Sequence, residues 1–151
     1  MWGMLVGFLW FSNDFKKDSI VCHESEIRTA TAFNFRTHDP KYICLNEQKL
    51  KDFVYKYFDS HLLAYDKKMR CFPDCDDFAN ICFADILRGA IRQGFDYQPA
   101  FGVASVTLAN GRRHMLNFAV TSEHRLLFYE PQSKKWLENS KEILFVHELI
   151  L

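Results

Sequence analysis

The chain has 151 residues, of which 48% are hydrophobic and 16% are aromatic. This length and composition predict one globular domain over residues 1–151 with its own core, and they exclude a disordered chain. The 19 basic and 19 acidic residues cancel, and no run of Lys or Arg exceeds two residues, so we expect no nucleic acid partner.

The cysteines and the N-terminal residues bear on location. Five cysteines, an odd number without the spacing of a secreted scaffold, favour reduced thiols and a cytoplasmic protein. Residues 1–11, MWGMLVGFLWF, are apolar but too short to span a bilayer, and they lack the basic start and cleavage site of a signal peptide. We expect a buried strand or helix there and no membrane partner; a cleaved signal at 1–11 is the alternative.

The first half of the chain predicts one strand and one helix. Residues 29–37, TATAFNFRT, alternate enough for a strand, and the HDP that follows at 38–40 is typical of a turn. From Asn46 onward the apolar spacing becomes helical, with Asn46 as the N-cap. The residues expected to face the core are Leu50, Phe53, Val54, Tyr57 and Phe58.

A second helix is predicted from Cys75 to about Arg92, with Asp74 as its cap. Its inward side chains are expected to be Phe78, Ile81, Cys82 and Ile86. Gly89 or Gly94 lies where a helix commonly ends.

The remaining sequence predicts strands. FGVASVTL and HMLNFAVT flank ANGRR, and an Asn-Gly pair between alternating segments is a strong hairpin signal. RLLFYEP and EILFVHELIL follow as a third and a fourth strand. Helices followed by an antiparallel meander predict an α+β fold, with helices packed on an antiparallel sheet.

Cys75 is the candidate nucleophile. At a helix N-terminus, free backbone N–H groups and the helix dipole stabilise a thiolate. The neighbouring Asp74, Asp76 and Asp77 oppose that charge, so a cation is needed nearby. His114, at the start of the strand after the Asn-Gly turn, is the candidate.

Glu130 is the predicted orienting partner of His114. If the strands that carry these two residues pair in antiparallel fashion, Glu130 comes near the level of His114 on one face. Asn117 lies three residues from His114 and would point to the opposite face of a regular strand, which makes it the weaker choice.

These residues resemble the papain-like and transglutaminase-like cysteine protease superfamily, and most closely the C-terminal cysteine-protease domain of the fairy ring mushroom agglutinin and its relatives. The resemblance is carried by DCDDFA at 74–79, His114 and EPQ at 130–132, and it covers roughly residues 42–132. It implies a papain-like core in which Cys75 is the nucleophile, His114 the base and Glu130 the orienting group.

The resemblance also implies calcium activation. Asp76 and Asp77, with Asp74, would then bind Ca²⁺ through oxygen and cancel the local negative charge. The alternative is that these aspartates only favour the helix start through its dipole.

Two features depart from the family pattern. No threefold repeat precedes Cys75, so lectin activity is not expected. The position six residues before Cys75 is Met69 instead of Gln, so the predicted oxyanion donors are the Cys75 backbone N–H and Gln132.

The predicted function is a thiol hydrolase of peptide or isopeptide bonds, acting on a peptide or protein substrate through a thioester on Cys75. A transglutaminase-type acyl transferase uses the same three residues and stays open as an alternative. A non-catalytic binding module on the same fold is the alternative from a different class.

Overall fold

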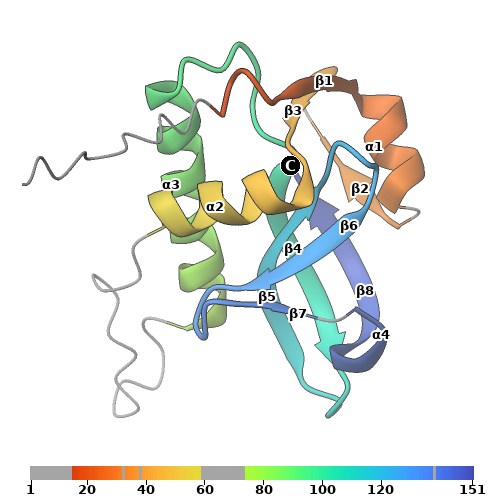
Figure 1. The fold of residues 1–151 in the computed structure, drawn as a ribbon. Coiled ribbons are helices and arrows are strands. Elements are labelled where there is room, and N and C mark those ends of the chain that lie inside the picture. Colours follow the sequence, from red (N-terminus) through yellow and green to blue (C-terminus); the bar gives the residue numbers. More distant parts are fainter. Residues whose placement is uncertain (1–14, 32, 38, 59–73, 138) are drawn as a thin grey trace, which may run out of the picture.

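The computed structural model describes residues 15–31, 33–37, 39–58, 74–137 and 139–151. The segment predicted at 1–11 and the thiol of Cys71 lie outside these ranges. In chain order the elements are β1 (Ile20–His23), α1 (Glu24–Thr31), β2 (Phe35–Arg36), β3 (Lys41–Cys44), α2 (Glu47–Tyr57), α3 (Cys75–Arg92), β4 (Phe101–Leu108), β5 (Arg113–Val120), β6 (Leu126–Glu130), β7 (Lys135–Leu137), α4 (Asn139–Glu142) and β8 (Ile143–Ile150) (Figure 1).

One large sheet organises the described chain. Its six strands have the order β2-β8-β4-β5-β6-β7, and β1 and β3 form a separate two-stranded sheet. The pairs from β8 through β7 are antiparallel, whereas β2 joins β8 in parallel. The predicted α+β class, with helices packed on a sheet, is confirmed.

Helices cover both faces of the large sheet. On one face, α2 and α3 pack side chains such as Phe53 and Ile86 against Phe101 and Ala119 of the sheet. On the other face, Ile27 of α1 packs within the cluster that contains Phe118 and its neighbours. Figure 1 shows α2 and α3 together on one side of the strands and α1 on the other. The sheet therefore separates two apolar cores.

The two predicted helices are confirmed, and so are their caps. Asn46 precedes α2, and its Oδ1 accepts a hydrogen bond from the backbone N–H of Lys49 at 2.9 Å. Helix α3 begins at Cys75 directly after the N-cap Asp74 and ends at Arg92. Both starts follow the local preference of Asn and Asp for the N-cap.

The strand predicted at residues 29–37 is wrong over its first part. Thr29 to Thr31 close helix α1, and only Phe35 and Arg36 form a strand. Ile27 and Thr31, four residues apart, are both buried, which is the spacing of a helix face. Burial against the sheet outweighs the strand preference of Thr.

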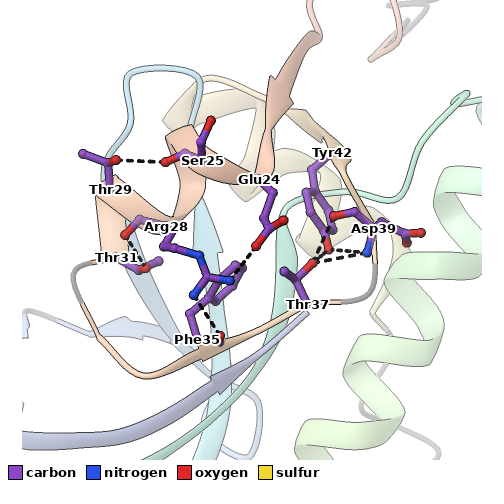
Figure 2. A network of polar contacts seen from close by, with 9 residues as sticks. All are labelled: Glu24, Ser25, Arg28, Thr29, Thr31, Phe35, Thr37, Asp39 and Tyr42. Carbon is purple, nitrogen blue, oxygen red and sulfur yellow. Dashed lines mark hydrogen bonds and ion pairs between the residues drawn. The ribbon is translucent and has the colours of Figure 1, made fainter.

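Polar contacts hold α1 against the segment that follows it. Arg28 donates to a carboxylate oxygen of Glu24 and to the backbone carbonyl of Phe35, and the hydroxyls of Thr37 and Tyr42 are hydrogen bonded (Figure 2). Sequence reasoning missed this helix.

The predicted hairpin is confirmed, but the meander is not complete. Strands β4 and β5 pair from Phe101 with Ala119 to Thr107 with Arg113, and β6 follows β5 as predicted. Strand β8 then returns beside β4 instead of continuing the meander, and the short β7 takes the place next to β6. Local patterns predict strands but not which strands become neighbours.

Among the described residues, no helix is both long enough and apolar enough to cross a membrane.

Candidate functional site

A cavity of about 670 Å³ lies where the start of α3 meets the start of β5 and the end of β6. It is lined by residues singled out in the sequence, namely Asp74, Cys75, His114, Glu130 and Gln132. Helix α3 and the consecutive strands β5 and β6 therefore contribute the predicted nucleophile, base and orienting group to one cavity.

The start of α3 fixes Cys75. The backbone N–H of Asp74 donates to Oδ2 of Asp77 at 3.0 Å, which closes a capping box around the first turn. Cys75 is the first residue of the helix and is half-buried. Its thiol therefore stands at the end of the helix where backbone N–H groups are free of intrahelical partners.

His114 and Glu130 form a close pair. Nε2 of His114 is hydrogen bonded to Oε2 of Glu130, and the two side chains are only 14% and 13% exposed. The backbone N–H of Gln132 donates to the second oxygen of Glu130 at 3.0 Å. Both oxygens of the Glu130 carboxylate are thus hydrogen bonded. The bond to Glu130 uses Nε2 of His114 and leaves Nδ1 for another partner.

Asn117 has a different role from Glu130. Its side chain is fully buried, and its Nδ2 donates to the carbonyls of Ala79 at 2.9 Å and Gly102 at 3.0 Å. Ala79 lies one turn after Cys75 on α3. Asn117 therefore ties the helix that carries the thiol to strands β4 and β5, and it does not bind His114.

The other described thiols belong to the cores. Cys22, Cys44 and Cys82 are at most 1% exposed, and burial raises the pKa of each. Cys82 was predicted to be a core residue, and this is confirmed. Of the described thiols, Cys75 is the one that lines the cavity.

The three aspartates at the start of α3 lie close together. Each of Asp74, Asp76 and Asp77 offers a carboxylate oxygen, and these atoms lie within 4.8 Å of one another. Such oxygens suit a hard cation, although one oxygen of Asp77 already accepts the capping hydrogen bond. The Ca²⁺ site stays a prediction.

Sequence reasoning missed four residues that line the cavity, namely Leu108, Arg112, Arg113 and Ser133. The first three lie on the hairpin that presents His114, and Ser133 follows Gln132. Their position beside predicted site residues was the available signal. Their side-chain directions depended on the turn, where Gly111 adopts a φ of 81°.

Comparison with known proteins gives fold relatives but no family. No protein-family model and no curated protein matches this sequence. A solved structure described as "PSL1a-E64 complex" superimposes with a TM-score of 0.64 at 14% identity, covering 87% of this chain and 51% of that one. A structure of the Polyporus squamosus lectin, bound to the human-type influenza-binding epitope Neu5Acα2-6Galβ1-4GlcNAc, gives a TM-score of 0.63 at 15% identity, covering 89% and 50%.

These matches correct the predicted family. The structures that share the fold are described as a lectin and as PSL1a in complex with E64, and neither is described as a papain-like cysteine protease. The assignment to the papain-like or transglutaminase-like superfamily, and with it the label of thiol protease or hydrolase, is therefore wrong. The resemblance rested on short motifs around three residues, whereas the superpositions cover 87% and 89% of this chain.

The chain spans about half the length of the solved structures it matches. At 14% and 15% identity, the likeness establishes a shared fold.

Proposed function

We propose that the cavity at the start of α3 binds an acyl compound and that Cys75 accepts its acyl group. The single observation that supports this is the convergence of Cys75, His114 and Glu130 on one cavity, with His114 already hydrogen bonded to Glu130. A nucleophile, a base and a group that orients the base are the parts that covalent acyl transfer requires.

The proposed first step uses the two nitrogens of His114 differently. Glu130 engages Nε2, which directs Nδ1 to take the proton of the Cys75 thiol. The sulfur then attacks the acyl carbon, the bond to the leaving amine or alcohol breaks, and His114 returns the proton to that leaving group. A thioester on Cys75 results.

The second step releases the acyl group. An amine gives its proton to His114 and attacks the thioester, the carbon–sulfur bond breaks and leaves the acyl group on the amine, and His114 returns the proton to the Cys75 sulfur. Negative charge that develops on the acyl oxygen would be stabilised by the free N–H groups at the start of α3 and by the Gln132 side chain.

The first test is selective alkylation. With limiting iodoacetamide and peptide mapping, we expect Cys75 to be modified well ahead of the buried Cys22, Cys44 and Cys82, and the His114→Ala variant to slow that reaction. Equal modification of Cys75 in both proteins would overturn the proposed role of His114.

A non-catalytic binding module is the second candidate. It is favoured by the fold, since one matched structure is described as a lectin bound to a sialylated glycan. Titration calorimetry with Neu5Acα2-6Galβ1-4GlcNAc tests it directly. Binding of this glycan together with an unreactive Cys75 would favour the module, whereas a reactive Cys75 without glycan binding would favour acyl transfer.

A further inference from the structure

Two adjacent arginines line the same cavity as Cys75. Arg112 ends the hairpin turn, and Arg113 is the first residue of β5, directly before His114. The turn holds their backbone firmly, because the N–H of Arg112 donates to Oδ1 of Asn110 at 3.0 Å and its carbonyl accepts from the N–H of Leu108 at 2.9 Å. Both guanidinium groups are therefore attached to a fixed part of the cavity wall.

Neither arginine has a carboxylate partner in the described part of the chain. Of the other described arginines, Arg28, Arg36, Arg88 and Arg125 each form an ion pair, and Arg92, at the exposed end of α3, forms none. Glu130 lies in the same cavity, but its two carboxylate oxygens already accept hydrogen bonds from His114 and from the backbone N–H of Gln132. No ion pair joins Asp74 to Arg112 or Arg113 among the described residues. Two exposed like charges thus line one cavity without an ion-pair partner among the described residues.

We propose that Arg112 and Arg113 bind a carboxylate of the ligand, so that the site prefers acyl compounds with a negative charge close to the acyl carbon. This inference rests on the proposed function for the reaction, though not for the binding of the anion. A guanidinium matches a carboxylate with two parallel N–H donors. Because both arginines line the same cavity as His114 and Cys75, the bound charge would lie near the base and the thiol.

Two alkylating reagents of similar size test the preference without a known substrate. Iodoacetate carries a carboxylate, and iodoacetamide is its neutral counterpart. The quantity to measure is the ratio of their rates at Cys75 in low salt. In the Arg112→Gln/Arg113→Gln variant we expect the iodoacetate to iodoacetamide ratio to fall about tenfold, because the attraction for the anion is lost.

The control is Arg88→Gln/Arg92→Gln, which also removes two positive charges, from α3 outside the cavity lining, although Arg88 is ion-paired with Asp85. It should leave the ratio unchanged. Raising the salt concentration to about 0.5 M should reduce the difference in the rate ratio between the native protein and Arg112→Gln/Arg113→Gln, since exposed charges are screened. Thermal melting of both double variants verifies that they fold. The Arg113→Lys variant keeps the positive charge but loses the two parallel N–H donors of the guanidinium, so it should give an intermediate rate ratio.

The outcomes separate this inference from the proposed function. If His114→Ala slows iodoacetamide but the arginine variant leaves the ratio unchanged, the anion site is overturned and the acyl-transfer proposal stands. If the alkylation rate of Cys75 is the same in the native protein and in His114→Ala, but the rate ratio still falls in the arginine variant, the anion site stands and the acyl-transfer proposal fails. An equal fall in both double variants would mean a general charge effect and would overturn the anion site.

Discussion

Cys75 and Cys82 lie two turns apart on the same helix, yet their surroundings differ in what governs thiol chemistry. Cys75 lines a cavity with a histidine and a glutamate, whereas Cys82 is 0% exposed among the side chains of α2, α3 and the sheet. Burial raises the pKa of Cys82 well above its usual value. The position of each thiol relative to the sheet, and not the helix that carries it, separates a reactive candidate from a core residue.

Removing Cys75 should have the largest effect on chemistry. We expect Cys75→Ala to lower the release of p-nitrophenol from p-nitrophenyl acetate by roughly 10³-fold or more, since the acyl acceptor is lost. Alanine favours helices, so the melting temperature should stay within a degree or two. Full activity in the folded variant would contradict the role of Cys75.

Changing Glu130 should have the next largest effect. Glu130→Gln keeps the shape but removes the charge that holds His114, so we expect the same reaction to slow about a hundredfold. The measurement should be made per folded molecule, with the unfolding curve recorded in parallel. A lower melting temperature with unchanged rate would mean that Glu130 is a structural residue only.

For the free energy of unfolding, we expect Cys82 to matter more than Cys75. Cys82→Ser places a hydroxyl without an arranged partner in the core and should lower the free energy of unfolding by about 1–3 kcal/mol. Cys75→Ser, at the half-buried cavity position, is the matched control and should change it by less than about 0.5 kcal/mol. Urea unfolding monitors both, and equal losses would contradict the contrast between the two sites.

Stability should also depend on pH through the buried thiols. The pKa values of Cys22, Cys44 and Cys82 are raised by burial, so the folded state keeps these thiols neutral while the unfolded chain ionises near the ordinary value of 9.0. Their contribution is complete below that pH and is lost as pH rises above it. Each thiol then contributes a slope of about −1.4 kcal/mol per pH unit.

Cys44→Ala separates this effect from other groups. Tyr129, whose pKa is also raised by burial, titrates in the same direction, so the informative quantity is the slope that the variant loses. Urea unfolding at pH 8 and pH 10 measures it. An identical slope in the variant would show that Cys44 does not ionise on unfolding.

The smallest expected effect concerns the aspartates. If Asp74, Asp76 and Asp77 bind Ca²⁺, millimolar CaCl₂ should stabilise the protein, by about 1.4 kcal/mol at ten times the dissociation constant. Asp76→Asn should abolish the shift while leaving the capping pair of Asp74 and Asp77 in place. MgCl₂ is the control cation, and an equal shift with both salts, or no shift with either, would contradict a calcium site.

Much of the site could be predicted because its parts have local signals. The N-cap Asp74 and the apolar spacing after it predict where α3 begins, and the Asn-Gly pair predicts the turn that precedes His114. The pairing of His114 with Glu130 followed from the expectation that a tight connection brings β5 and β6 together. The role of Arg112 and Arg113 could not be predicted, because whether an arginine has an ion-pair partner is known only after the chain has folded.

Local sequence specifies helices α2 and α3, their caps and the β4–β5 hairpin, since these depend on residues within a few positions of one another. Contacts between distant parts of the chain specify the remaining features. Strand β8 lies beside β4, and residues 24–31 form a helix because Ile27 and Thr31 are buried against the far face of the sheet. Such choices depend on apolar surface contributed by distant parts of the chain, which no local pattern records.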